Sequence, residues 1–235
     1  MKRRRFIETW GACGASFSLG ALPTLAEERA EPRWYGRARL IGAGGQSIKA
    51  TALTAHRTYV FHYPFAGTPC FLINLGRPLA SSAALKTSAA RSYEWRGGVG
   101  PSRSVVAYSA ICSHRMTYPT REISFISYRE TPTPGSKHAA VIHCCSEHSQ
   151  YDPAAGGRVL AGPAPQPLAA ILLEHDPKTD ELAAVGTLGG ELFDEFFSKY
   201  ELRLALDHGG RAREATRGDC LVTELSNFCK QQVKC

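Results

Sequence analysis

The chain has 235 residues, of which 43% are hydrophobic, so it is long enough to bury one core and suits a single domain with appendages. Its formal net charge is +7, but four basic residues and one acidic residue fall within the first eight positions, which leaves about +4 for the rest. This mild charge, with no aromatic residues interleaved among basic ones, gives no reason to expect a nucleic-acid partner. Neither a complete dinucleotide loop, a nucleophile elbow nor an HExxH helix occurs, and we assign no catalytic residue.

The first 30 residues resemble a targeting segment. Residues 2–7 (Lys-Arg-Arg-Arg-Phe-Ile) fit the twin-arginine export pattern, and no charged side chain occurs from Thr9 to Ala26. Residues 1–30 are therefore expected to be a twin-arginine signal, or a membrane anchor if the chain is not cleaved after Ala26. A basic, unstructured tail is the alternative. Export would place the protein on the periplasmic side of the cytoplasmic membrane, either anchored or released.

Hydrophobic alternation and turn residues predict mostly β-strands between residues 31 and 188. A hairpin is expected where Thr58–Tyr63 and Cys70–Leu75 flank a turn at 64–69 that contains Pro and Gly. The other expected strands are Lys49–Leu53, Ser104–Tyr108, Ile123–Tyr128, Ala140–His143, Ala169–Glu174 and Leu182–Val185, the last two joined by a turn at 176–180. The fold class is thus expected to be mainly β.

The hydrophobic period changes after residue 189. Apolar residues between Glu191 and Leu206 fit one face of an amphipathic helix, which Gly209 and Gly210 would end. Residues 189–235 are therefore expected to form an α-helical C-terminal extension.

Two short Cys/His boxes are the chemically most informative feature. Cys112 and His114 form a C-x-H box, and Cys145 and His148 form a C-x-x-H box 30 residues further on. Together they offer two thiolates and two imidazoles, the donor set of an asymmetric [2Fe–2S] centre in which one iron takes both Cys and the other both His. A C₂H₂ zinc finger keeps its two Cys together and its two His together, so the order Cys-His…Cys-His argues against that site.

Two other interpretations of the boxes remain. Cys112 and Cys145 could form a disulfide beside unrelated histidines, or the four residues could hold zinc, since a tetrahedral site with two sulfurs and two nitrogens suits that ion.

The residues around the boxes resemble those of the Rieske iron–sulfur proteins. A glycine-rich turn at 97–100 and the segment 104–111 lead into the first box, while Ser149–Asp152 gives a Ser-x-Tyr-Asp sequence after the second. A Gly-Pro-x-Pro loop at 162–165 matches the loop that covers the cluster in that family. The resemblance is clear from about residue 95 to 175.

The resemblance implies a fold and a cofactor. The fold is an antiparallel β-sandwich over residues 31–188, with a small rubredoxin-like cluster-binding subdomain at about 108–168. The cofactor is one Rieske-type [2Fe–2S] cluster per chain. In the family the serine hydroxyl donates to a bridging sulfide and the tyrosine hydroxyl to a ligand sulfur, which implies that Ser149 and Tyr151 raise the potential of the cluster. The alternative is that both residues only form the turn. The loop expected to cover the cluster contains Gly162, Pro163 and Pro165.

Two departures from the family pattern stand out. Rieske proteins of cytochrome bc complexes carry a second cysteine in each box, and these two form a disulfide, but no cysteine occurs near Thr117. Cys144 precedes Cys145, and it is an alternative ligand that the C-x-x-H spacing disfavours. The glycine that follows the second ligand His in the family is also missing, because His148 is followed directly by Ser149.

The other cysteines and histidines have no clear partners in the sequence. Export into an oxidising compartment permits disulfides, and Cys220 could pair with Cys229 or Cys235. The pairing of Cys70 and Cys144 is likewise left open. Among the remaining histidines only His143, beside Cys144, is of interest.

The predicted function is one-electron transfer through the cluster in a respiratory or periplasmic electron-transport chain. The first hypothesis is the iron–sulfur subunit of a quinol:cytochrome c oxidoreductase, with quinol and a cytochrome as partners. The second is the small subunit of a larger periplasmic oxidoreductase, similar to arsenite oxidase. A non-redox, zinc-binding scaffold is the hypothesis from another class.

Overall fold

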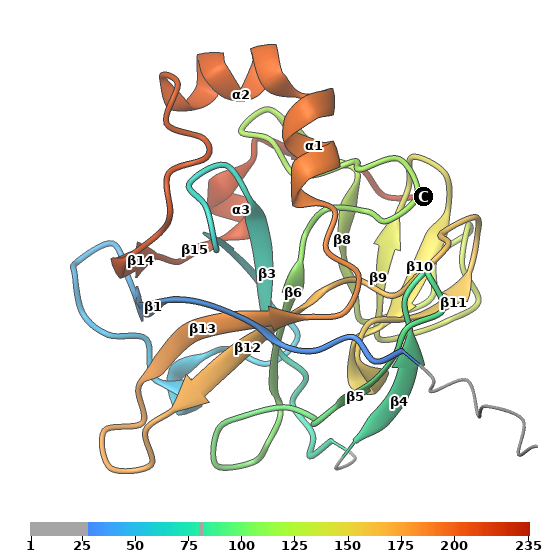
Figure 1. Ribbon diagram of the computed structural model, residues 1–235. Coiled ribbons are helices and arrows are strands. Elements are labelled where there is room, and N and C mark those ends of the chain that lie inside the picture. The colour runs from blue at the N-terminus through green and yellow to red at the C-terminus, as the bar shows by residue number, and fades with distance from the viewer. Residues whose placement is uncertain (1–27, 80–81) are drawn as a thin grey trace, which may run out of the picture.

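The computed structural model describes residues 28–79 and 82–235 (Figure 1). The predicted twin-arginine segment, apart from its last three residues, lies outside the described residues. Within the described part of the chain, no helix has the length and apolar character needed to cross a membrane.

The largest element is an eight-stranded sheet whose neighbours are antiparallel except for one parallel edge pair, β1 with β14. Its order is β14-β1-β13-β12-β6-β3-β2-β15, so strands from both ends of the chain meet in one sheet. The strands, in that order, are Gly218–Leu221, Arg33–Ile41, Leu182–Leu188, Ala170–His175, Val105–Ser109, Pro69–Asn74, Thr58–His62 and Thr223–Glu224.

The central strands are apolar on both faces because each face packs on a different core. Along β3, Phe71 and Ile73 belong to one buried cluster, and Cys70 and Leu72 belong to another. Alternate residues of a strand point to opposite faces, so a nearly continuous apolar run is what such a doubly covered strand requires.

A second, four-stranded sheet lies at the side of the first and carries the candidate site (Figure 1). It is an antiparallel arrangement in the order β11-β10-β9-β8. Two small two-stranded sheets complete the β-structure, β7 with β16 and β4 with β5. The bounds are β4 Ala83–Lys86, β5 Ser92–Trp95, β7 Ile123–Ser124, β8 Ile126–Arg129, β9 Val141–Cys144, β10 Ser149–Asp152, β11 Arg158–Ala161 and β16 Gln231–Gln232.

The mainly β fold class predicted from the sequence is confirmed. One expected strand is wrong: the segment 49–53 contains a 3₁₀ turn, Ala50–Ala52. The backbone N–H and the hydroxyl of Thr51 both donate to the Asp180 carboxylate, and Ala52 N–H donates to Lys49 O. Bonds within the 3₁₀ turn and to the distant turn at 176–180 thus satisfy these backbone groups in place of a strand partner.

The expected strand at 123–128 is also interrupted. It divides into β7 and β8, which belong to different sheets, on either side of Phe125.

The expected helix over 191–206 is two helices, α1 (Phe193–Lys199) and α2 (Glu201–His208), which meet at Tyr200. α1 buries Phe193, Phe196 and Phe197, but α2 buries only Leu204. Residues two apart lie on opposite faces of a helix. Because Leu204 is on the buried face of α2, Leu202 and Leu206 lie on the outer face and are 83% and 84% exposed.

The C-terminal extension is not only helical. After α2 it adds β14 and β15 to the two edges of the main sheet, forms the short helix α3 (Leu225–Phe228), and ends in β16. The extension is thus built into the same body as the sheets. α1 packs on Ile111, directly before the first box, in a third hydrophobic cluster that also includes Met116 and Tyr118.

Candidate metal centre

Two buried sulfurs, those of Cys112 and Cys144, lie together between two loops. Cys112 follows β6, and Cys144 is the last residue of β9. Their side chains are hydrogen-bonded, and both residues are almost fully buried. The hydrogen bond from Cys144 lowers the pKa of Cys112 to about 6, with help from Tyr151 and two backbone N–H groups and against the effect of burial. The same hydrogen bond and burial raise the pKa of Cys144, so Cys144 holds its proton more strongly than Cys112 does.

Each of the two loops directs backbone N–H groups at its cysteine sulfur. Backbone N–H groups of His114 and Arg115 stabilise the thiolate of Cys112, and those of Ser146 and Glu147 do the same for Cys144. In each loop the donors are the residues two and three positions after the cysteine. Donors aimed at sulfur favour the thiolate, which is the form that binds metal.

Cys145 does not take the place expected from the C-x-x-H spacing. Its sulfur is bonded to that of Cys235, 90 residues further along the chain. A sulfur in a disulfide is not a thiolate and cannot ligate iron. The structure therefore corrects the expected pair: Cys112 faces Cys144, and the disulfide between Cys112 and Cys145 that we considered is absent as well.

Tyr151 is placed to donate to the Cys112 sulfur. Its hydroxyl lies 3.2 Å from Cys112 Sγ and accepts a hydrogen bond from the N–H of Ser113 at 3.1 Å. The Ser113 hydroxyl donates its only proton to the carbonyl oxygen of Gln166, 2.7 Å away. The phenolic proton of Tyr151 therefore has two acceptors within reach, Cys112 Sγ and Ser113 Oγ, which lies 3.1 Å away.

Two buried polar atoms near the two cysteines in the sequence have no hydrogen-bond partner among the described residues. They are Nδ1 of His114, the histidine of the first box, and Oγ of Ser149, at the start of β10. Leaving a buried polar group unpaired costs roughly 1–3 kcal/mol. A nitrogen able to bind iron and a hydroxyl able to donate to a sulfide are what a Rieske-type cluster would use at these places, so these residues fit that group.

His148 and Glu147 point in different directions at the tip of the second loop. His148 is exposed, has a positive φ of 58°, and has its ring centroid 5.8 Å from that of His143. The Glu147 carboxylate pairs at 3.5 Å with Arg115, the residue that follows the first box. Of these two residues, Glu147 is therefore the one that contacts the first loop, through its ion pair with Arg115.

A spacing in the sequence would have indicated this arrangement. In the family pattern a ligand Cys is followed by two residues, a His, a Gly and then the Ser, so the Cys precedes the Ser by five positions. Cys144 precedes Ser149 by five positions, whereas Cys145 precedes it by four. Counted from Cys144, Glu147 stands at the second His position, and His148 stands at the Gly position, where its positive φ is the conformation that glycine favours.

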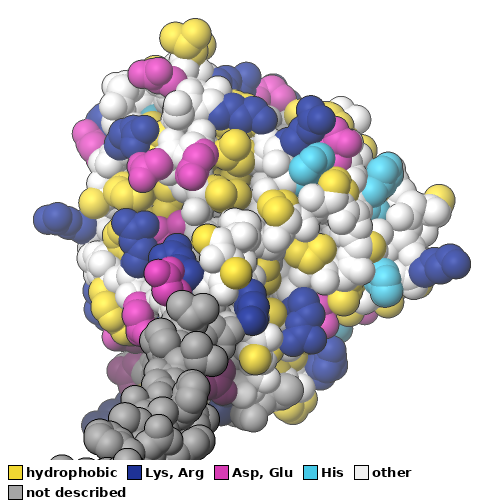
Figure 2. Space-filling model, turned by 45° about the vertical axis from the view of Figure 1, so that its right-hand side comes forward, with side chains coloured by type: hydrophobic (Ala, Val, Ile, Leu, Met, Phe, Trp, Pro, Cys, Tyr) yellow, Lys and Arg dark blue, Asp and Glu magenta, His cyan; other side chains and the backbone are white. Residues whose placement is uncertain are grey.

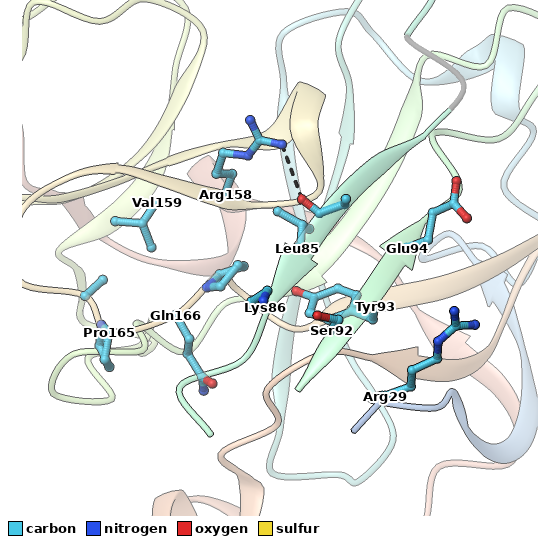
Figure 3. A pocket seen from close by; sticks show the side chains of 13 residues that line it. Arg29, Leu85, Lys86, Ser92, Tyr93, Glu94, Arg158, Val159, Pro165 and Gln166 are labelled. Carbon is cyan, nitrogen blue, oxygen red and sulfur yellow. Dashed lines mark hydrogen bonds between the residues drawn. The ribbon is translucent and has the colours of Figure 1, made fainter. Parts of the chain in front are cut away.

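The Gly-Pro-x-Pro loop touches both boxes. Its neighbour Gln166 accepts the hydrogen bond from Ser113 described above. At Gly162, with φ of 84°, an added Cβ would lie 2.5 Å from His148 O and 2.6 Å from Ser149 Cα. Only glycine permits so close an approach. The other side of this loop borders a pocket of about 550 Å³ (Figure 3), to which Pro165, Gln166 and Arg158 contribute.

The chain is similar to two curated proteins along most of its length, although no protein-family model matches it. It is 27% identical over 190 residues to the iodate reductase subunit IdrB of Pseudomonas sp. (strain SCT), which covers 80% of each chain. It is 28% identical over 192 residues to the iodate reductase subunit IdrB of Denitromonas iodatirespirans, with 80% of this chain and 82% of that protein covered. Among solved structures, the soluble domain of the Rieske protein II (soxF) from Sulfolobus acidocaldarius is 28% identical, covers 67% of this chain and 82% of that chain, and has a TM-score of 0.44.

The similarity to the two IdrB subunits agrees with the cysteine and histidine pattern and the Ser-x-Tyr-Asp turn. The resemblance to the Rieske iron–sulfur proteins predicted from the sequence is confirmed.

Proposed function

We propose that this protein is the electron-transfer subunit of a larger oxidoreductase and binds one [2Fe–2S] cluster between its two loops. The observation that carries the proposal is the buried pair Cys112 and Cys144, with Tyr151 donating to one sulfur and the Nδ1 of His114 left without a partner. When bound, such a cluster accepts and returns one electron.

The chain itself binds and tunes the cluster. Cys112 and Cys144 supply thiolates, and His114 supplies an imidazole nitrogen. Tyr151 and Ser149 donate hydrogen bonds to sulfur, which stabilises the reduced, more negative state. The Gly-Pro-x-Pro loop, packed on both boxes, excludes water from the sulfurs.

The fourth donor in this proposal is Glu147. Its carboxylate is directed to the first box through Arg115, and it stands at the histidine position when residues are counted from Cys144. A carboxylate adds a negative charge that an imidazole does not. Because that charge opposes reduction, the potential should lie below that of a cluster with two histidine ligands.

The relatives favour a partnership with a separate catalytic subunit over a quinol:cytochrome c role. Both are named as subunits of iodate reductase and match about four fifths of this chain. Reduction or oxidation of the substrate would then take place on the partner subunit. Electrons would pass at the end of the molecule that carries the four-stranded sheet, where His side chains are exposed (Figure 2). Co-purification of a larger redox subunit with the tagged full chain tests this partnership.

The first prediction separates the two adjacent cysteines. Cys144→Ser should abolish the cluster, because it removes a thiolate ligand, whereas the matched variant Cys145→Ser should keep the iron. Iron content and the EPR spectrum of the dithionite-reduced protein measure both. A cluster that survives in Cys144→Ser but not in Cys145→Ser would restore the original assignment. One equivalent of zinc with no iron in the parent protein would instead support a non-redox scaffold.

The second prediction concerns the fourth donor. Glu147→His should raise the midpoint potential by at least several tens of millivolts, because it removes a negative charge next to the iron, and a tenfold change in the one-electron equilibrium is about 59 mV. The EPR spectrum should move towards that of clusters with two histidines. His148→Ala is the control and should change neither. If His148→Ala loses the cluster while Glu147→His leaves its potential unchanged, Glu147 is not the donor.

The third prediction concerns the hydroxyl groups. Tyr151→Phe and Ser149→Ala should each lower the potential by roughly several tens of millivolts, since each removes a hydrogen bond that is stronger in the reduced state. Redox titration followed by EPR measures the shift. Potentials equal to the parent's in both variants would mean that the two residues only form the turn.

The location proposed for the protein is the periplasmic side of the cytoplasmic membrane, reached by twin-arginine export. The support is residues 2–7 and the uncharged stretch that follows them. As a fourth prediction, replacing Arg3 and Arg4 together by Lys should leave the protein in the cytoplasmic fraction with its cluster intact. Lys2→Arg, which keeps the pair, should be exported normally. Unchanged export of the double Lys variant would contradict the signal.

A further inference from the structure

A second group of metal-binding side chains lies beside the Cys145–Cys235 disulfide. The ring nitrogens of His143 are 3.6 and 3.7 Å from Cys235 Sγ. Potential ligand atoms of His143, His148 and Cys235 all lie within 4.8 Å of one another. With Cys145 bonded to Cys235, two sulfurs and two imidazoles converge at one place.

This group is distinct from the cluster site, although both use β9. His143 and Cys144 are consecutive residues of that strand, so their side chains point to opposite faces. Cys144 faces Cys112, whereas His143 faces Cys235. None of the four residues is used as a cluster ligand in the function proposed above.

We propose that Cys145, Cys235, His143 and His148 form a second metal site that is closed by the disulfide and, once the disulfide is reduced, binds a divalent cation of the zinc class. Two thiolates and two imidazoles in a tetrahedron are the set that selects zinc.

The spacing of the donor atoms suits that ion. Zinc lies about 2.3 Å from sulfur and about 2.0–2.1 Å from nitrogen, which places tetrahedral ligands roughly 3.3–3.8 Å apart. The distances from His143 to Cys235 already fall in this range. The ligand atom of His148 lies within 4.8 Å of those of His143 and Cys235, and the two sulfurs have to separate when their bond is broken.

The C-terminal tail is held in place independently of the disulfide. β16 pairs with β7, the N–H of Val233 donates to Ser124 O at 2.9 Å, and the guanidinium of Arg129 donates to Val233 O. Cys235 would thus stay near His143 after reduction, and little chain entropy would be lost on metal binding.

The group is also open to solvent on one side. His148 is exposed, Cys145 and Cys235 are partly exposed, and only His143 is buried. A small dithiol and a hydrated cation can both reach the sulfurs.

The overall step balances with an external dithiol as the reductant. The protein disulfide takes two electrons, its S–S bond breaks, and the dithiol becomes a disulfide. The two protein thiols lose two protons as they bind the cation, so one dithiol and one M²⁺ give one metal site, one small disulfide and two released protons.

The test uses the full chain with its cluster and zinc alone as the probe. Samples with and without prior treatment by a dithiol are incubated with Zn²⁺ under nitrogen and desalted. The reduced protein should retain one additional zinc per chain, and the oxidised protein should retain none. X-ray absorption at the zinc edge should show two sulfur and two nitrogen neighbours, with the iron content and EPR signal of the cluster unchanged.

Matched variants identify the ligands. Cys235→Ser and His148→Ala should lose the zinc, whereas Cys229→Ser, a free thiol of the same tail, and His138→Ala, an exposed histidine of the same subdomain, should keep it. His148→Ala replaces an exposed side chain, so it should fold even if Cys235→Ser does not. Equal zinc in oxidised and reduced protein, or zinc retained by His148→Ala, would overturn the proposal. Loss of iron alone in these variants would instead show that they belong to the cluster, and would overturn it too.

Discussion

The constraint on which the site depends is the burial of two sulfurs against each other. Cys112 and Cys144 are almost fully buried, and their side chains are in contact. Two thiolates in contact repel strongly in a medium of low dielectric constant. Without a cation the two sulfurs can hold only one negative charge between them, because loss of a second proton would place two like charges side by side. A metal centre removes the limit by replacing the proton with positive charge. The N–H groups of both loops and the hydroxyl of Tyr151 are directed at the same sulfurs, so the pocket is organised for more negative charge than the metal-free pair can carry.

The loops keep this geometry without a disulfide between them. The first loop is held by Ser113, which joins Tyr151 to the carbonyl of Gln166, and by the aromatic residues of α1 behind Ile111. The second loop is tied through Cys145 to the last residue of the chain. A disulfide that closes a loop of 90 residues contributes roughly 4–5 kcal/mol in the chain-entropy model. The C-terminal extension is therefore a structural partner of the second loop, which explains why its short strands are built into the sheets.

The sequence predicted the fold class well, because hydrophobic alternation along a strand is a local signal. Alternation along β2 and β3 identifies a hairpin, and C-x-H places a thiolate and an imidazole on one loop. The C-x-x-H spacing could not predict the Cys145–Cys235 disulfide, because it says nothing of a partner 90 residues away. Only the fold brings Cys235 to Cys145, where the disulfide makes that sulfur unavailable as a thiolate. The five-residue interval from Cys144 to Ser149 was available in the sequence, but the C-x-x-H count outweighed it. The break at Tyr200 was missed for a similar reason. The spacing of apolar residues fitted one helix, whereas burial of the α1 aromatic side chains determines where that helix ends.

Strand alternation explains why one short segment can serve two purposes. β9 presents Cys144 to one face and His143 to the other, and the next residue, Cys145, begins the turn that leads to Glu147 and His148. A one-residue change of register would send Cys145 to the cluster and expose Cys144 to the tail. The pairing of Cys144 with Ser149 and of His143 with Gln150 fixes the register, and Ser149 and Tyr151 share the face of Cys144. A change of register would therefore displace these two hydroxyl groups and the Cys144 sulfur together. For that reason we expect the spacing between Cys144 and Ser149, more than the spacing within the box, to decide which cysteine binds the cluster.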